Sequence, residues 1–385
     1  MNQFLIYLFL ILISLLYCRT PLPKELYEPK IRVDFQKENI PVVFVPGIKG
    51  STLVDNDNNT RWLTSSQALG LTTPDLRLLG DSKDLIARGA VERVTAIPHL
   101  IDVDIYGPWL ERMANEKGID FYVFSYDWRK DNLETRDRLS MFLSEIGKKY
   151  SRKPVLVGHS MGGMLSFSVV NQNPNLVEKV VYVGVPFRGG IGYMKDLYVG
   201  VSTGFNSTIQ SPCMIAKYQT VYVFFPRLGT NDSKGLVEDN IGNPIEVDFF
   251  KESVWKEKKL GFYNHTCKKE DTPNEIEFQT ILDRAKQFRA SLDPSPQIIK
   301  SNPSSLIVTG ENRDTRKSFR ALDNSLTKWD MEIAPKAAGD GSVLYEHSIP
   351  PIGISFTTIK TDHEHSVMLN DKSAQKGILD FILRK

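Results

Sequence analysis

Residues 155–163 read V-L-V-G-H-S-M-G-G, an apolar run followed at once by the pattern G-x-S-x-G. A strand before this pattern and a helix after it are the setting that a nucleophile elbow requires. The sharp turn crowds the backbone around the serine, and Gly158 and Gly162 remove Cβ atoms that would collide. We therefore expect Ser160 to present its hydroxyl at the end of a strand. The amide of Met161, at the helix N-terminus, would then bind a developing oxyanion.

Strand-like runs and amphipathic helical stretches alternate on both sides of this motif. The apolar, β-branched runs cover residues 40–45, 121–125, 155–157, 180–185, 306–309 and 354–359. The helical patterns cover residues 108–116, 133–149, 161–171 and 376–383. This alternation implies a mostly parallel central sheet flanked by helices. With the serine motif it predicts the α/β-hydrolase fold.

The alternation stops after Pro186, where glycine-rich turns and aromatic clusters replace it for about a hundred residues. We expect residues 195–300 to form a cap inserted over the sheet. The α/β core then has two parts, residues 30–194 and 301–385, and its first part contains a small membrane-facing insertion at 51–75. One core with inserted segments accounts for the length of 385 residues.

The serine needs a base, and the base needs a carboxylate that orients it. In this fold the chain order is serine, acid, histidine. His363 and His365 both come shortly after the strand-like run at 354–359. His365 is the predicted base because it opens the run V-M-L at 367–369, and His363 is the alternative. Asp340 is the predicted acid because its two flanking glycines favour a tight loop, about 25 residues before His365. Asp314 is the alternative acid, since it follows the preceding strand-like run at the position that is standard for this fold.

The second oxyanion donor is expected in the loop after the first strand, V-P-G-I-K-G-S at residues 45–51. The donor there is the backbone N–H of Lys49, so the identity of its side chain need not matter. Each such donor contributes about a hundred- to a thousandfold in rate. The alternative is that this loop is only a glycine-rich turn with no role in catalysis.

The chain begins with an apolar run at residues 4–17 that is short for a membrane span. We interpret residues 1–18 as a signal peptide. This interpretation predicts entry into the secretory pathway and a location outside the cell or in a lysosomal or vacuolar lumen. A retained membrane anchor is the alternative, because no Lys or Arg precedes the run and the cleavage site is not A-x-A-like.

Two cysteines follow that segment, Cys213 and Cys267, and an oxidising compartment would favour a disulfide between them. Sequons of the form N-x-S/T agree with passage through a secretory pathway. The four candidate glycosylation sites are Asn58, Asn206, Asn231 and Asn264. Three of the four fall within the predicted cap, which indicates exposed surface in that part of the chain.

The composition argues against several other classes of protein. Basic and acidic residues nearly cancel, with a formal net charge of +2, so nothing in the charge pattern indicates a nucleic acid partner. The histidines are scattered and the cysteines lack ligand spacing, so no metal site is predicted. The chemistry expected of Ser160 needs no cofactor.

Six motifs, in order, make the chain resemble the lecithin:cholesterol acyltransferase family, which includes the lysosomal phospholipases A and the phospholipid:diacylglycerol acyltransferases. The motifs are V-P-G-I-K-G-S at 45–51, Y-D-W-R at 126–129, G-H-S-M-G-G at 158–163, G-V-P-F-R-G-G at 184–190, G-D-G-S-V at 339–343 and E-H-x-x-M-L at 364–369. Many lipases share G-H-S-M-G-G, whereas Y-D-W-R together with G-D-G-S-V is far more specific.

The resemblance implies Ser160, Asp340 and His365 as a catalytic triad, with the amides of Lys49 and Met161 as the oxyanion hole. It also implies that Asp127 and Arg129 form a structural ion pair beneath the site.

The same resemblance makes Trp62 the candidate for an interfacial tryptophan that contacts a membrane. No cysteine lies near Trp62, so the disulfide that ties this loop in the animal plasma enzymes is absent. Activation by an apolipoprotein therefore does not carry over, and no activator protein is identified. Lys49 stands where leucine is usual, which alters the rim of the pocket without removing the amide.

These features predict a serine-dependent O-acyltransferase or phospholipase A. Ser160 would attack an sn-1 or sn-2 ester of a phospholipid, and the acyl-serine would pass its acyl group to water or to a lipid alcohol such as a sterol, ceramide or diacylglycerol. The expected partners are a phospholipid membrane or lipoprotein surface and the lipid alcohol acceptor. The competing hypotheses are a neutral lipase or carboxylesterase of the same fold and a catalytically inert lipid-binding protein.

Overall fold

The structure is a computed structural model that describes residues 36–78, 85–97, 101–332 and 335–384. The segment interpreted as a signal peptide, residues 1–18, lies outside the described residues. None of the helices in the described ranges combines the length and the hydropathy needed to cross a bilayer.

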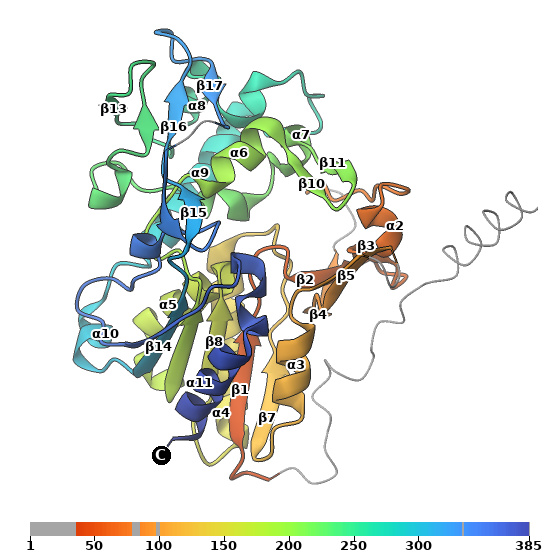
Figure 1. Cartoon of the computed structure of the whole chain (residues 1–385), viewed down its shortest axis with the longest axis vertical. Helices are drawn as coiled ribbons and strands as arrows, with labels where there is room; N and C mark the ends of the chain where they lie inside the picture. Colours follow the sequence, from red (N-terminus) through yellow and green to blue (C-terminus); the bar gives the residue numbers. More distant parts are fainter. Residues whose placement is uncertain (1–35, 79–84, 98–100, 333–334, 385) are drawn as a thin grey trace, which may run out of the picture.

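Six parallel strands form the central sheet, in the order β19-β14-β9-β8-β1-β7 (Figure 1). They are β1 (Ile40–Val45), β7 (Ile119–Val123), β8 (Val155–His159), β9 (Lys179–Val183), β14 (Ser304–Thr309) and β19 (Thr357–Lys360). Each predicted apolar run contributes one of these strands. The predicted α/β-hydrolase fold is confirmed.

Helices cover both faces of the sheet. Successive side chains of its strands point to opposite sides, so both faces carry apolar side chains that need cover. The four covering helices are α3 (Gly107–Ala114), α4 (Asn132–Lys149), α5 (Met161–Gln172) and α11 (Lys372–Leu383). Val43 and Val45 of β1 belong to the apolar core that contains α4 and α5. Val42 and Phe44 belong to the core that contains α3 and α11. The turn after β8 therefore emerges from a sheet that is packed on both sides.

The chain after β9 builds a cap beyond one end of the sheet (Figure 1). Its elements include α6 (Gly192–Val199), β10 (Val201–Thr203), β11 (Asn206–Gln210), α7 (Pro212–Ile215), the 3₁₀ helix η2 (Gln219–Phe224), α8 (Glu252–Glu257) and α9 (Glu275–Ala290). The buried ring of Trp255 packs edge-on against Tyr222, Phe225 and Phe278. This aromatic cluster gives the cap an apolar core of its own. The last helix before β14, α10 (Pro296–Lys300), packs instead on α5 of the core.

A small sheet in the cap takes its strands from two distant stretches of the chain. Its order is β13-β12-β16-β17, and β12 (Val237–Glu238) pairs parallel with β16 (Phe319–Ala321). The outer strands are β13 (Pro244–Ile245) and β17 (Trp329–Asp330). The predicted limit of the cap at residue 300 therefore divides one sheet, because β16 and β17 belong to a stretch that was expected to return to the core.

The insertion after β1 is larger than the predicted 51–75. It begins with a three-stranded antiparallel sheet in the order β3-β2-β4, from β2 (Ser51–Val54), β3 (Thr60–Trp62) and β4 (Ile86–Ala90). The short helix α2 (Ser65–Ala68) and the hairpin of β5 (Arg93–Ile97) and β6 (Ile101–Asp104) complete it. In Figure 1 these elements lie beside the main sheet, on the right.

Candidate active site

Ser160 lies at the sharp turn between β8 and α5. Its backbone has φ 52° and ψ −123°, a conformation that residues with a side chain rarely adopt. A Cβ on Gly158 would lie 2.5 Å from Ser166 Oγ, and one on Gly162 would lie 2.2 Å from the carbonyl oxygen of Val45. Both positions therefore need glycine, and the turn holds the serine at the end of β8.

Ser160, His365 and Asp340 form one hydrogen-bonded chain. Nδ1 of His365 lies 2.8 Å from Oδ2 of Asp340, and its Nε2 lies 2.8 Å from Oγ of Ser160. Because a carboxylate oxygen only accepts, the proton of a neutral imidazole lies on Nδ1, which leaves Nε2 as the acceptor for the serine hydroxyl. A histidine in this state can remove the serine proton.

Asp340 is held by a tight loop at the end of β18 (Lys336–Gly339). Its Oδ1 accepts hydrogen bonds from the amides of Ser342, at 2.9 Å, and Val343, at 2.7 Å. Burial alone would raise the pKa of Asp340. The charge and hydrogen bond of His365, together with the two amides, hold that pKa below its usual value. The carboxylate is therefore stabilised in its ionised form.

The alternative acid and base lie apart from this chain. Asp314, on β15 (Arg313–Arg316), has a side chain that is 81% exposed and lies 3.5 Å from Nζ of Lys336. The side chain of His363 is 45% exposed, and its Nδ1 lies 3.7 Å from a carboxylate oxygen of Asp371. The structure brings Asp340 and His365 to the serine, not these two residues.

The loop after β1 passes directly beside the serine. A Cβ on Gly47 would lie 3.0 Å from the Cβ of Ser160. Lys49, two residues further on, has a left-handed backbone with φ 63°. The loop that contains Lys49 therefore passes beside Ser160, and Met161, the first residue of α5, follows it directly. That their two amides bind an oxyanion stays a prediction. We call residues 46–50 the oxyanion loop.

The expectation that Trp62 contacts a membrane is wrong for this structure. Its side chain is buried, with 4% exposure, and its ring packs edge-on against Trp128 at 5.2 Å between centroids. The indole N–H donates to the carbonyl oxygen of Lys49 at 2.8 Å. The hydroxyl of Tyr126 donates in the same way to the carbonyl oxygen of Pro46, also at 2.8 Å. Trp62 therefore fixes the oxyanion loop from within.

The side chain of Lys49 makes a polar contact of its own. Its ammonium lies 3.6 Å from Oδ2 of Asp196 on α6 and 5.6 Å from the ring centroid of Tyr193. Burial lowers the pKa of Lys49, and the Asp196 carboxylate partly offsets that effect. Burial likewise raises the pKa of Asp196, with Lys49 opposing it. The pair connects the oxyanion loop to the first helix of the cap.

A buried network behind the serine was not predicted from the sequence. The hydroxyl of Tyr106 lies 3.0 Å from the amide nitrogen of Gly47 and 2.7 Å from Nδ1 of His159. Nε2 of His159 lies 2.9 Å from the carbonyl oxygen of His365. The only sequence signal was the position of His159 next to Ser160. Tyr106 lies in an irregular segment and gave none.

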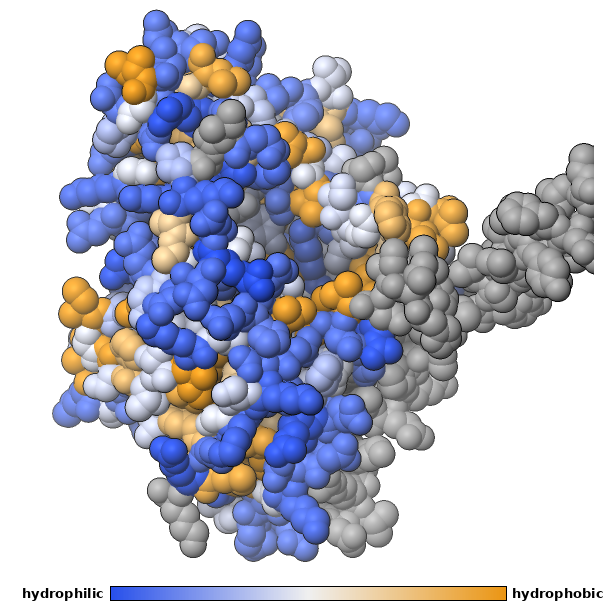
Figure 2. Space-filling model, viewed as in Figure 1, coloured by the Kyte–Doolittle hydropathy of each residue, from blue (hydrophilic) through white to orange (hydrophobic). Residues whose placement is uncertain are grey.

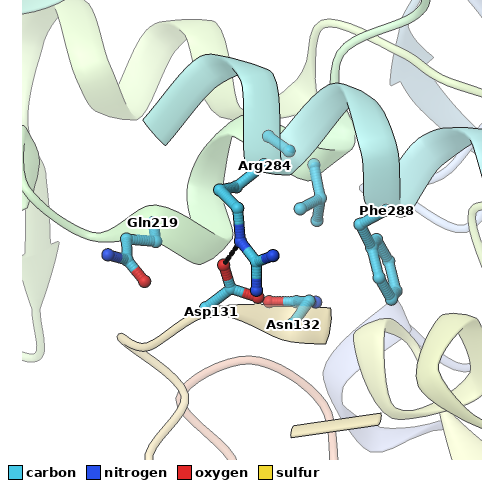
Figure 3. A pocket seen from close by; sticks show the side chains of 7 residues that line it. Asp131, Asn132, Gln219, Arg284 and Phe288 are labelled. Atoms are coloured by element: carbon cyan, nitrogen blue, oxygen red, sulfur yellow. Dashed lines mark hydrogen bonds and ion pairs between the residues drawn. The ribbon is translucent and has the colours of Figure 1, made fainter. Parts of the chain in front are cut away.

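The cap reaches the neighbours of the serine. The hydroxyl of Thr220 on η2 lies 2.7 Å from Sδ of Met161 and 2.7 Å from Oδ1 of Asn132. Nearby, Arg284 of α9 donates at 2.6 Å to Asp131, whose carboxylate also caps α4 (Figure 3). Asp131, Asn132 and Arg284 border a small pocket between the cap and the core, and Figure 3 shows Arg284 directed at Asp131. The exposed fraction of Ser160 is only 5%.

Asp127 and Arg129 form a buried, two-pronged ion pair. Nε of Arg129 lies 2.8 Å from Oδ1 of Asp127, and Nη2 lies 2.6 Å from Oδ2. Nη1 of Arg129 donates to the carbonyl oxygen of Leu76 at 3.0 Å. The pair thus joins the loop after β7 to the insertion, and neither residue belongs to the chain of Ser160, His365 and Asp340.

Cys213 and Cys267 form a disulfide within the cap, with their Cα atoms 5.6 Å apart. Three sequon asparagines are exposed, namely Asn58, Asn231 and Asn264. The expectation of an exposed sequon is wrong for Asn206, which is 2% exposed and whose amide nitrogen donates to the carbonyl oxygen of Gln67 at 2.9 Å. A glycan there would break that contact. Across the described ranges, no three His, Cys, Asp or Glu side chains gather as a ligand set for a metal.

Comparison with known sequences gives two matches. A family model described as lecithin:cholesterol acyltransferase matches residues 102–293. An uncharacterized protein of Saccharomyces cerevisiae is 25% identical over 281 residues, which cover 71% of this chain and 42% of the yeast protein. This chain therefore spans less than half the length of that curated relative.

Comparison with solved structures gives matches to much of this chain. The crystal structure of the Tle4-Tli4 complex contains a chain with a TM-score of 0.55 and 13% identity, and the match covers 90% of this chain and 99% of that one. The mature form of the Bacillus licheniformis lipase BlEst2 has a TM-score of 0.40 and 14% identity, with 91% of this chain and 94% of the lipase covered. At 13% identity, the likeness to the chain in the Tle4-Tli4 complex concerns the fold alone.

Proposed function

Since the chain belongs to the lecithin:cholesterol acyltransferase family, we propose that it is a serine-dependent phospholipase A or lipid O-acyltransferase. Family and fold indicate a hydrolase-type enzyme that acts on lipid esters. The choice of a phospholipid as donor and of a lipid alcohol as acceptor is the finer part of the proposal. The observation that carries the proposed serine chemistry is the hydrogen-bonded chain from Asp340 through His365 to Ser160.

The first half-reaction transfers the acyl group to the enzyme. Nε2 of His365 takes the proton of Ser160 as Oγ attacks the carbonyl carbon of the phospholipid ester. The amides of Lys49 and Met161 donate to the oxyanion of the tetrahedral intermediate. The intermediate collapses when the imidazolium returns its proton to the departing lysophospholipid oxygen. An acyl ester of Ser160 and a neutral His365 remain.

The second half-reaction repeats these steps with a new nucleophile. His365 removes a proton from a lipid alcohol or from water, and that oxygen attacks the acyl-serine carbonyl. Collapse returns the proton to Oγ of Ser160 and releases a new ester or a free fatty acid. The low exposure of Ser160 and the contact of Thr220 with Met161 support a covered site, which favours a bound alcohol over bulk water.

The proposed substrate source is a phospholipid membrane or a lipoprotein surface. With Trp62 buried, two other apolar side chains near the insertion support such a contact: Leu71 and Phe205 are 63% and 64% exposed. The two segments that carry them lie side by side, because the amide of Phe205 donates to the carbonyl oxygen of Ala68 at 2.7 Å. Figure 2 shows hydrophobic side chains exposed on this side of the molecule.

The proposal includes a location in the lumen of the secretory pathway, a lysosome or a vacuole, or outside the cell. The disulfide between Cys213 and Cys267 supports it, because disulfides persist in oxidising compartments. The three exposed sequons agree with it. Treatment of the expressed protein with an N-glycosidase tests this part: a shift in mobility is expected, and it should remain when Asn206 is changed to Gln.

Incubation with vesicles of phosphatidylcholine and sterol, followed by lipid mass analysis, tests the activity. Lysophosphatidylcholine should appear together with sterol ester or fatty acid, and Ser160→Ala should abolish both products. Turnover of soluble short-chain esters without any vesicle activity would favour a carboxylesterase instead. A folded wild type that a fluorophosphonate does not label would contradict the proposed chemistry.

A further inference from the structure

A continuous chain of buried hydrogen bonds runs behind the serine and joins the oxyanion loop to the main chain of the base. We propose that Tyr106 and His159 are positioning residues, which hold the Lys49 amide and the His365 imidazole in fixed relation to Ser160. This inference rests on the proposed function. It adds two residues that the sequence motifs do not assign to the reaction.

The direction of each hydrogen bond follows from the donors and acceptors available. The carbonyl oxygen of His365 only accepts, so Nε2 of His159 must carry a proton. Nδ1 of a neutral His159 is then an acceptor, and the hydroxyl of Tyr106 donates to it. The Tyr106 oxygen in turn accepts from the amide of Gly47. All the bonds therefore run in one consistent pattern, from Gly47 to His365.

Burial keeps this pattern in a single protonation state. Tyr106 and His159 are 2% and 4% exposed. Burial lowers the pKa of His159 to about 3, to which the nearby His365 also contributes, so the imidazole is neutral at working pH. Burial also raises the pKa of Tyr106, so its hydroxyl keeps its proton. One neutral tautomer of His159 is therefore fixed by its two partners.

The chain joins two loops that come from opposite parts of the sequence. Gly47 lies two residues before Lys49, and the carbonyl that His159 holds belongs to His365 itself. The amide of His365 also donates to the carbonyl oxygen of Asp340 at 3.1 Å. The backbone of the base is thus fixed on both sides, and a shift of either loop would change the distance between the developing oxyanion and the imidazole. A displacement of about 1 Å can cost about a hundredfold in rate.

The first test compares Tyr106→Phe with a matched control, Tyr222→Phe. Both tyrosines are buried, and the Tyr222 hydroxyl donates to Ala216 in the cap at 2.7 Å, away from the serine. Each variant loses one buried hydroxyl, so both should lose some thermal stability. Only Tyr106→Phe should lower kcat, by about 10- to 100-fold, with KM little changed. If both variants instead lose kcat to the same extent, in step with their melting temperatures, Tyr106 has only a structural role and the inference is wrong.

The second test uses His159 and does not depend on the stability of the first variant. His159→Gln places an amide N–H where Nε2 donates, whereas His159→Leu has no donor. We expect the glutamine variant to stay within about tenfold of the wild-type kcat and the leucine variant to fall about 100-fold. Equal kcat values for the two variants at similar melting temperatures would overturn the positioning role.

Labelling with a fluorophosphonate separates this inference from the proposed function. Labelling of the wild type but not of Ser160→Ala, with slower labelling of Tyr106→Phe than of Tyr222→Phe, supports both. Labelling at the same rate in Tyr106→Phe and Tyr222→Phe overturns the positioning role alone. An unlabelled wild type overturns the proposed function itself.

Discussion

The indole N–H of Trp62 donates to the carbonyl oxygen of Lys49 across 2.8 Å, so a buried side chain of the insertion fixes the loop beside the serine. The ring itself packs against Trp128. This bond acts on the residue whose amide is a proposed oxyanion donor. Trp62 is therefore tied to the reaction through the geometry of a loop and not through contact with lipid.

We expect Trp62→Phe to lower kcat without changing the partition of the protein onto vesicles. Phenylalanine keeps much of the packing but removes the donor, and a neutral hydrogen bond contributes about 1 kcal/mol to stability. Vesicle co-sedimentation and kcat on a soluble ester measure the two effects. Leu71→Ser is the comparison, because it should weaken sedimentation and leave kcat on the soluble ester unchanged. A large loss of vesicle binding in Trp62→Phe would restore its interfacial role.

Asp340→Asn should lower kcat by a factor on the order of 10⁴, because an asparagine no longer stabilises the proton on Nδ1 of His365 in the required tautomer. Asp314→Asn is the control, since that carboxylate is mostly exposed and lies away from His365. Hydrolysis of a p-nitrophenyl ester measures both. Similar activity of Asp340→Asn and the wild type would remove Asp340 from the proposed triad.

Lys49→Met should change kcat by less than about tenfold, because methionine keeps the backbone amide that we propose as the oxyanion donor. It also leaves the half-buried Asp196 without its cation, so some loss of thermal stability is expected. Parallel measurement of kcat and melting temperature distinguishes the two effects. A loss of a hundredfold or more at an unchanged melting temperature would assign the ammonium a direct part in the reaction.

The stability of the protein should fall with acidification because of His159. Its folded pKa of about 3 lies below the unfolded value of about 6.5. The contribution of His159 to the free energy of unfolding is therefore fully present above pH 6.5. It is lost as the pH falls toward 3, by at most about 1.4 kcal/mol per pH unit. Urea unfolding between pH 4 and pH 7 measures this slope. His159→Gln should reduce it.

Gly162→Ala should destabilise the protein severely and abolish activity, because its Cβ would lie 2.2 Å from the carbonyl oxygen of Val45. Gly147→Ala is the matched control. Its Cβ would have its nearest contact at 3.7 Å, with Pro154, and it lies within α4. Alanine there should stabilise the fold by about 0.5–1 kcal/mol. Thermal melting and ester turnover measure both variants, and an active, stable Gly162→Ala would contradict the geometry of the turn.

The central sheet could be predicted from the sequence because a buried parallel strand has a simple local signal. The runs at 40–45 and 155–157 are apolar and β-branched, and they became β1 and β8 with little shift. Ser160, Asp340 and His365 could be predicted because each lies in a short motif whose glycines or flanking strand restrict its backbone. In these cases local sequence and tertiary structure agree.

The cap sheet and the network behind the serine could not be predicted, because both depend on contacts between distant segments. The pairing of β12 with β16 joins strands of two and three residues, too short for a periodic pattern. The hydrogen bonds of Tyr106 depend on where two loops meet. Trp62 shows the same limit: a tryptophan near an insertion can face lipid or face the core, and only the three-dimensional packing distinguishes them.

The interleaved cap sheet has a consequence for engineering. β16 lies on the stretch that leads into β18 and Asp340, yet it pairs with β12 of the cap, and β17 joins the same sheet through β16. A chimera that exchanged only residues 195–300 with a relative would leave β16 without its partner, just upstream of the acid. A transplant of the cap therefore has to carry both stretches together, because they share one sheet.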